Sequence, residues 1–438
     1  MKTPICDYVN QYAASNSLRL HMPGHKGRGS LGVEGLDITE ISGADSLYEA
    51  SGIIWQSEEN ASGLFGCPTF YSTEGSSQCI RAMVQLAMEY AKTQGKRPVI
   101  AAGRNAHKTF LSAAALLDPE VVWIIGGEDS YLSCHISPAQ LSQVCESCQP
   151  AAVYVTSPDY LGRVADIKAL AEVAHRYGAL LLVDNAHGAY LRFLQPSCHP
   201  MDLGADLCCD SAHKTLPVLT GGAYLHTTAQ FAQGAKDALA LFGSTSPSYL
   251  ILQSLDACNA YLAEGYREKL DAFLPAAEAL KSRLVAAGFC LYGNEPMKIT
   301  LHTKPWGYRG VELGDMLEKA GIICEFADPD YLVLMLTPEV GMEGLARLEQ
   351  ALLAVPRREP IEEKAPLFHR CLQAVSIREA MLSPKCHVPV EDAVGYILAS
   401  PSVGCPPAVP IAVCGERIDR EACEAFRYYG ITHCQVMK

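Results

Sequence analysis

The first residue of this sequence that could carry out covalent chemistry is Lys214. It lies in the segment Ser211–Thr215, where His213 precedes it, and the apolar residues 216–219 follow. An apolar environment lowers the pKa of a lysine and favours the free amine, which is the form that attacks a carbonyl to make a Schiff base. Ser211 and His213 could bind a phosphate while the amine reaches an aldehyde. An ordinary surface lysine is the alternative interpretation.

A carboxylate and a histidine follow two apolar runs of the chain. Asp184 comes directly after the run 179–183, 30 residues before Lys214. At the end of a strand it could bind a metal, act as a nucleophile, pair with a heterocyclic N–H or only cap the next helix. His107 follows the run 98–103 and could stack flat on an aromatic cofactor, although Asn105 beside it is also a common helix-capping residue.

A small, hydroxyl-rich segment precedes a helical pattern near residue 80. Gly75, Ser76 and Ser77 would give that helix a start with free N–H groups and a positive dipole end, which suits a phosphate. An ordinary helix cap uses the same residue types. In chain order, however, phosphate-binding helix start, histidine, aspartate, lysine and the pair Gly221-Gly222 form the layout of a pyridoxal 5'-phosphate enzyme, and the conjunction is more specific than any part.

Buried strands and an intervening helix are expected to position these residues. The runs 98–103, 121–126, 151–156 and 179–183 are continuously apolar, as in strands that are covered on both faces of a parallel sheet. Apolar residues recur at helical spacing between 166 and 177. This strand–helix–strand order predicts an α/β domain with a mostly parallel sheet, whose ligands bind at the carboxyl ends of the strands.

The pattern changes after residue 249. A long helical connection is expected over 249–287, followed by strands at 298–302 and 331–336 and helices at 311–320 and 342–353. The predicted division is an N-terminal segment (1–45), a large cofactor-binding domain (46–280), a small α+β domain (281–355) and a short C-terminal domain (356–438). The Pro-rich stretch 405–410 in this last part predicts a rigid loop.

Composition narrows the function classes. The 438 residues carry a formal charge of −13 and are 49% hydrophobic, which argues for large cores and against a nucleic-acid or anionic-membrane surface. No secretory signal and no apolar run long enough to cross a membrane is evident, so a cytoplasmic location is expected. The 18 cysteines are therefore expected to be buried thiols. A zinc site at Cys145 and Cys148 is the weaker alternative, and no metal is predicted.

Beyond these residues, further motifs occur along the chain. The segments are His21–Gly27, Asp37–Glu40, Arg104–Lys108, Asp184–Gly188, Ser211–Pro217, Thr245–Tyr249 and Arg378–Ala380. In this order they resemble the motifs of the Orn/Lys/Arg decarboxylase family of fold-type-I pyridoxal-phosphate enzymes, and the resemblance runs over almost the whole chain.

The resemblance implies a role for each candidate residue. Lys214 would form the Schiff base, Asp184 would bind the ring nitrogen, and His107 would stack on the ring. His187 would lie near the 3′ oxygen of the ring. The phosphate would be surrounded by Gly75, Ser76, Ser77, Ser211 and His213.

The resemblance also concerns assembly. A short form without the long N-terminal wing domain of the inducible members is expected. A homodimer with its active site at the subunit interface is expected, with a tetramer as the alternative, and Ser246–Tyr249 is a candidate to reach the neighbour's site.

Four positions depart from the usual family motifs. Asn185 stands where a glutamate is usual, and Thr73–Ser77 replaces Asn-Gly-Thr-Ser. Thr220-Gly221 replaces Thr-Gln, and Cys405–Pro410 replaces Tyr-Pro-Pro-Gly-Ile-Pro. In the family this C-terminal region helps to shape the substrate end of the site.

The leading hypothesis is α-decarboxylation of arginine, lysine or ornithine, as in polyamine biosynthesis, with Lys214 or His213 returning the proton. A cationic substrate side chain needs an acid, for which Asp45, Glu325 and Asp328 are candidates. Two enzymatic alternatives are an aminotransferase, with Arg309 as the carboxylate clamp, and a lyase. A third is a decarboxylase-like binding protein without activity.

Overall fold

The computed structural model describes residues 1–126, 130–400 and 409–438. The chain divides into two compact units. Unit 1 contains residues 1–98, 150–153 and 167–268, and unit 2 contains residues 99–149, 154–166 and 269–438. The division of the chain into four sequence domains stays a prediction.

The central element is a seven-stranded sheet with the order β1-β7-β6-β5-β4-β2-β3, in which β4 is the strand shared by the two units. Pairs β5–β6 and β2–β3 are parallel, whereas β7 runs antiparallel to β1 and β6. The predicted α/β class with a mostly parallel sheet is confirmed. The strands are β1 (Thr69–Ser72), β2 (Val99–Gly103), β3 (Glu120–Ile124), β4 (Ala152–Thr156), β5 (Leu180–Asp184), β6 (Leu207–Asp210) and β7 (Ala223–Thr227).

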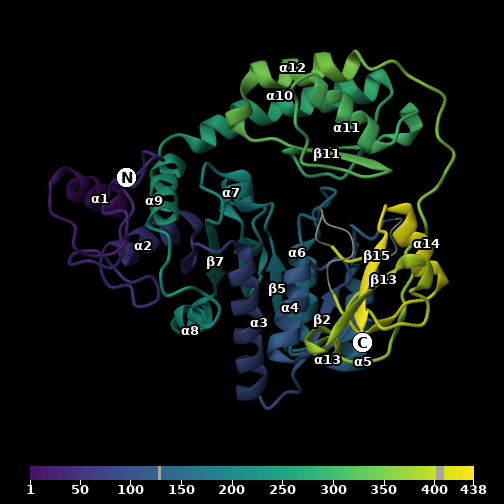
Figure 1. Ribbon diagram of the computed structural model, residues 1–438, viewed down its shortest axis with the longest axis horizontal. Coiled ribbons are helices and arrows are strands. Elements are labelled where there is room, and N and C mark those ends of the chain that lie inside the picture. Colours follow the sequence, from purple (N-terminus) through teal and green to yellow (C-terminus); the bar gives the residue numbers. More distant parts are fainter. Residues whose placement is uncertain (127–129, 401–408) are drawn as a thin grey trace. The chain divides into compact units, whose positions relative to one another are not determined.

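The four apolar runs became β2, β3, β4 and β5. Every residue of β2 and β5 is buried, as expected for strands that are covered on both faces. The helical pattern between 166 and 177 is α6 (Ile167–Arg176), which packs on β5. Helix α3 (Ser76–Thr93) buries Cys79, Ile80 and Met83 and packs on β6 and β7 (Figure 1).

The expected helical connection over 249–287 consists of two helices. Helix α9 spans Tyr249–Ala263 and α10 spans Tyr266–Ala287. The break falls at Gly265, whose φ of +89° lies in the left-handed region that favours glycine. The remaining helices of unit 1 are α1 (Pro4–Ala14), α2 (Ile53–Phe65), α7 (Ala212–Thr215) and α8 (Ala229–Ala240), with 3₁₀ turns at Ala189–Phe193 and Pro200–Leu203.

Unit 2 contains a second sheet with the order β10-β11-β9-β8. Strands β9 and β11 and helices α11 and α12 match the expected elements at 298–302, 331–336, 311–320 and 342–353. The bounds are β8 (Cys290–Tyr292), β9 (Lys298–His302), β10 (Phe326–Ala327), β11 (Tyr331–Met335), α11 (Gly310–Lys319) and α12 (Gly341–Leu353), with 3₁₀ turns at Lys304–Trp306 and Pro338–Val340.

The C-terminal part of unit 2 is built from two short strand pairs, β12–β14 and β13–β15. They are β12 (Leu372–Gln373), β14 (Glu416–Arg417), β13 (Lys385–Pro389) and β15 (His433–Met437), with α13 (Ile377–Leu382), α14 (Arg420–Tyr428) and a 3₁₀ turn at Val390–Asp392. Most of the predicted loop 405–410 lies outside the described residues, because Cys405, Pro406, Pro407 and Ala408 are among those not described.

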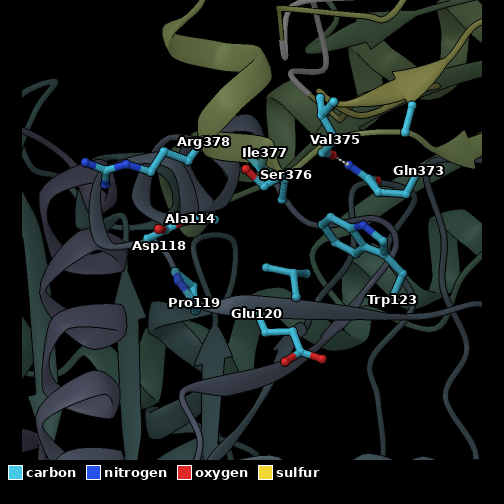
Figure 2. A pocket seen from close by; sticks show the side chains of 12 residues that line it. Ala114, Asp118, Pro119, Glu120, Trp123, Gln373, Val375, Ser376, Ile377 and Arg378 are labelled. Atoms are coloured by element: carbon cyan, nitrogen blue, oxygen red, sulfur yellow. Dashed lines mark hydrogen bonds between the residues drawn. The ribbon is translucent and has the colours of Figure 1, made fainter.

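Helix α13 packs against α4 (Lys108–Leu117) within unit 2. The Arg378 guanidinium donates to the carbonyl oxygens of Ala115 and Leu116 at 3.2 and 3.0 Å, where α4 ends. A pocket of about 360 Å³ lies beside this contact, and Figure 2 shows the Trp123 ring near Gln373 at its wall. Arg378, which belongs to one of the motifs that resemble the family, therefore caps the C-terminal end of α4.

Two further expectations concern the whole chain. All cysteines in the described ranges are free thiols, and nine of them, including Cys208 and Cys209, are buried. Across the described residues, the helices are too short or too polar to span a bilayer. Helix α5 (Pro138–Cys148) contains both Cys145 and Cys148.

Candidate active site

Lys214 sits in the single helical turn α7, four residues after β6 ends at Asp210. Its Nζ lies 3.0 Å from Nε2 of His187, which follows β5 and is 6% exposed. Lys214 and His187 were predicted as site residues separately, and the structure places their side chains in contact. This amine and imidazole are close enough to exchange a proton directly.

Asp184 is the last residue of β5 and is 2% exposed. Its Oδ1 accepts hydrogen bonds from the Ala186 N–H at 3.2 Å and from the Cys209 thiol at 3.6 Å. The Cys209 contact follows from the parallel register, in which Asp184 pairs with Cys209 across β5 and β6. The carboxylate is therefore held at the carboxyl edge of the sheet, where open α/β sheets bind ligands.

The predicted phosphate site combines the start of α3 with the end of β6. Ser76 and Ser77 are the first residues of this 18-residue helix, and the hydroxyl of Ser211 donates to Oγ of Ser76 at 2.8 Å. Gly75 has φ +71° and ψ 177°, a conformation that is nearly restricted to glycine. Backbone N–H groups at a helix start and several hydroxyls form a donor set that suits a phosphate.

Gly221 and Gly222 connect this helix start to the lysine motif. The Gly221 carbonyl accepts from the Gly75 N–H at 2.7 Å, and the Gly222 carbonyl lies 3.0 Å from Nδ1 of His213. Gly221 has φ +100°, and a Cβ there would lie 2.9 Å from the Thr73 carbonyl oxygen. The departure from the usual Thr-Gln therefore has a steric reason, because only glycine fits this backbone.

The protonation of His213 follows from that contact. A carbonyl oxygen can only accept, so Nδ1 of His213 carries the proton, and burial lowers the pKa of this imidazole from its ordinary value of 6.5. The neutral ring then has no proton on Nε2. Between the two predicted proton donors, this favours Lys214.

Glu74 is an acid in the segment where the family usually has an amide. Its side chain is exposed, and Oε1 accepts from the Ser244 N–H at 2.5 Å. The extra carboxylate is thus bound to a neighbouring loop. Behind it, Ser72 donates to Oε1 of Gln78 at 2.6 Å and fixes the turn into α3.

A buried group that the sequence interpretation missed lies beneath the lysine motif. Oδ2 of Asp210 accepts from Nε2 of both His199 and His226 at 3.1 Å, and all three side chains are 0% exposed. Burial alone would raise the pKa of Asp210, but the two imidazoles outweigh it and lower that pKa well below the usual range. The only signal in the sequence was an aspartate at the end of an apolar run.

The asparagine at position 185, where the family usually has a glutamate, is explained by its contact with Asp210. Its Nδ2 donates to Oδ1 of Asp210 at 2.7 Å. A glutamate at 185, as is usual in the family, would place a second carboxylate beside the ionised carboxylate of Asp210. Neither group would then carry a proton to donate to the other. The amide is therefore the side chain that suits a chain with aspartate at 210.

His107 belongs to unit 2, where it is the N-cap of α4. Its Nδ1 accepts from the Thr109 N–H at 3.1 Å. Nearby in sequence, the Arg104 guanidinium is 3% exposed and binds Glu416 Oε2 at 3.4 Å and the Pro410 carbonyl at 3.0 Å. Stacking of His107 on a cofactor ring stays a prediction.

Other predicted residues have structural partners of their own. Asp45 accepts from the N–H groups of Gly52 and Ile54 and so caps α2. Arg309 precedes α11 and pairs with Glu363 at 2.6 Å, which occupies the proposed carboxylate clamp. Tyr249 is 1% exposed and hydrogen-bonded to Asp45 within unit 1, whereas Ser246 is exposed. That the segment Ser246–Tyr249 reaches a neighbouring subunit stays a prediction.

The remaining two acids lie in unit 2. Glu325 is exposed and accepts from the Tyr160 hydroxyl at 3.2 Å. Asp328 is 7% exposed, and burial, then repulsion from Asp330, raises its pKa to about 7 against hydrogen bonds from two backbone N–H groups.

Comparison with known proteins shows the family to which this chain belongs. A family model described as "Orn/Lys/Arg decarboxylase, major domain" matches residues 3–291. The chain belongs to the Orn/Lys/Arg decarboxylase family. Over 96% of its length it is 30% identical to the uncharacterized protein YaaO and 26% identical to an arginine decarboxylase, both of Bacillus subtilis, covering 93% and 92% of those proteins.

The fold is shared with solved enzymes of low sequence identity to this chain. The lysine decarboxylase of Francisella novicida superposes with a TM-score of 0.80 at 15% identity, covering 100% of this chain and 81% of that one. A Sphingomonas wittichii serine palmitoyltransferase gives a TM-score of 0.59 over 81% of the chain. The fold is therefore that of the fold-type-I pyridoxal-phosphate enzymes, as the sequence predicts.

Proposed function

We propose that this member of the family is a pyridoxal-phosphate-dependent decarboxylase of a basic amino acid, namely arginine, lysine or ornithine. The observation that carries the proposal is the contact of Lys214 Nζ with His187 Nε2 at 3.0 Å, in the unit that also holds Asp184 and the serines at the start of α3. The B. subtilis arginine decarboxylase and the F. novicida lysine decarboxylase support the substrate class.

The residues present fit the cofactor. The hydroxyls of Ser76, Ser77 and Ser211 and the first N–H groups of α3 would hold its phosphate. Lys214 would bind its aldehyde carbon, and Asp184 would keep its ring nitrogen protonated. The bound cofactor would supply an electron sink for the pair of electrons left when carbon dioxide departs.

The protein's own groups would handle the proton. His187 can take a proton from Lys214 Nζ while the lysine acts as an amine, and return it when the lysine is displaced by the substrate amine. Lys214 would then hold a proton and donate it to the substrate carbon that has lost carbon dioxide. His213 would not supply this proton, because its only ring proton points to the Gly222 carbonyl. Phosphate binding by His213 stays a prediction.

Product identification tests the proposal. The protein with pyridoxal phosphate is incubated separately with arginine, lysine and ornithine, and amine and keto acid are measured by mass spectrometry. We expect one of the three amines. Keto acid without amine would show an aminotransferase, and cofactor binding without turnover of a broad amino-acid panel would show a binding protein. A homodimer, a cytoplasmic location and a part in polyamine biosynthesis stay predictions.

A further inference from the structure

A second cavity, of about 720 Å³, lies within unit 2 and shares no lining residue with the Lys214 site. Its walls come from the second sheet, from the segment 357–367 and from Tyr429. Buried or half-buried residues of the sheet side include Tyr292, His302, Lys304, Asp330 and Tyr331. Nothing in the proposed decarboxylation uses these groups.

The deep wall holds a buried ion pair. Lys304 Nζ lies 2.8 Å from Oδ1 of Asp330, and the two side chains are 4% and 5% exposed. The lysine has further partners in the Tyr428 hydroxyl and the Glu363 carbonyl. Its charge and donors are therefore already engaged, which makes it a poor site for an incoming anion.

Asp330 is not fully satisfied. Its Oδ1 accepts from Lys304 and from the Tyr428 hydroxyl at 2.7 Å, but its buried Oδ2 has no hydrogen-bond partner among the described residues. The neighbouring carboxyl of Asp328 is also buried, and its Oδ2 likewise lacks a partner there. Because burial raises the pKa of Asp328 to about 7, that carboxyl is partly protonated at neutral pH. The unpartnered Oδ2 of Asp330 is therefore the acceptor that the cluster offers to one more charged donor.

The remaining wall is aromatic. The rings of Tyr292 and Tyr331 meet edge to face with centroids 5.6 Å apart, and the His302 ring lies 5.4 Å from that of Tyr331. Burial lowers the pKa of His302, so this imidazole is neutral at pH 7 and does not repel a cation. Tyrosine faces bind ammonium groups and also pack on alkyl chains.

The exposed rim does not favour either sign of charge. Arg357 and Lys364 stand there with Glu362 and Glu363. Arg357 already lies over the Trp306 ring, with 5.4 Å from its guanidinium carbon to the ring centroid, and Glu363 pairs with Arg309. The charge of the ligand is therefore selected by the buried residues of the deep wall, Lys304 and Asp330.

We propose that this cavity is a binding site for a small organic amine, with the ligand's ammonium group donating to Oδ2 of Asp330 and its alkyl chain lying along Tyr292 and Tyr331. The residues that line the cavity do not include Lys214 or another residue of the proposed reaction, so its test does not depend on that reaction.

Calorimetric titration of the holoenzyme with 1-aminopentane and, as its anionic counterpart, pentanoate tests this site. We expect the amine to bind at least tenfold more tightly than pentanoate. Asp330→Asn should weaken amine binding by tenfold or more, because a charged hydrogen-bond partner is lost. Glu362→Gln on the rim is the matched control and should change the affinity by less than twofold.

Two further variants keep the test decisive. Tyr292→Leu removes an aromatic wall and leaves the ion pair intact. It should therefore weaken amine binding severalfold, a result that can be measured even if the Asp330→Asn variant does not fold. Lys214→Ala should leave this binding unchanged. Equal binding of amine and pentanoate would overturn the inference, as would amine binding that survives Asp330→Asn but disappears in Lys214→Ala. Neither result would bear on the proposed decarboxylation.

Discussion

The side chain that follows Asp184 lies against a carboxylate. Asn185 donates to Asp210, which two buried histidines hold from the other side. From the sequence, Lys214 and the serines of the helix start could be predicted because of their residue types and context, whereas His187 was predicted through the family resemblance. The Asp210 network could not be predicted, since His199, Asp210 and His226 come from three separate segments that meet only in the fold.

Exchange of the amide for a carboxylate tests the network. Asn185→Asp keeps the side-chain size but replaces a donor with a second acceptor beside Asp210. We expect the free energy of unfolding to fall by about 2 kcal/mol, the order of one hydrogen bond to a charged group. Chemical denaturation measures it. Asn294→Asp is the control, because Asn294 is exposed and uses its oxygen as an acceptor, so that variant should stay within about 0.5 kcal/mol. Equal stability of the two variants would contradict the account.

Short elements place the reactive residues. The four apolar runs predicted β2, β3, β4 and β5 because burial on both faces leaves a continuous apolar signature. Strands β6 and β7 were not predicted: the apolar run of β6 is only three residues long, and β7 contains His226 and Thr227, which are nevertheless buried. Asp210 and His226 can be buried in these strands because they form a hydrogen bond with each other.

The turn into α3 can be tested through its glycine. Gly75→Ala forces a side chain into φ +71° and ψ 177°, which costs on the order of 1–3 kcal/mol. We expect lower stability and weaker pyridoxal-phosphate binding, measured by visible absorption during titration. Gly63→Ala in α2 is the matched control: a Cβ there meets nothing within 4 Å, and the variant should be more stable by about 0.5–1 kcal/mol. Unchanged cofactor affinity in Gly75→Ala would argue against phosphate binding at α3.

At the scale of the whole molecule, sequence length and apolar content predicted large cores, and the motifs predicted the fold. The sequence could not predict that Arg104 and Glu416, 312 positions apart, form a buried ion pair in unit 2, because nothing local marks either residue as a partner. The same holds for the cavity at Asp330, whose walls come from separate segments.

Acid stability is one global consequence of the buried histidines. Burial, opposed in part by Asp210, lowers the pKa of His226 below 6.5 in the folded protein, so the unfolded chain binds its proton more readily as the pH falls. The contribution of His226 to stability is therefore present above pH 6.5 and is lost below it. The difference in unfolding free energy between the wild type and His226→Gln should shrink between pH 7 and pH 5. A difference that grows in acid would contradict this assignment.

The most direct test of the central claim is carbon dioxide release. Arginine, lysine and ornithine labelled with ¹³C in the carboxyl group are supplied to the protein with pyridoxal phosphate, and ¹³CO₂ is measured for the wild type, Lys214→Ala and the exposed-site control Lys92→Ala. The account predicts release from one of the three substrates, unchanged in Lys92→Ala and reduced at least 10³-fold in Lys214→Ala. Release that persists in Lys214→Ala, or no release by the wild type from any of the three, would contradict it.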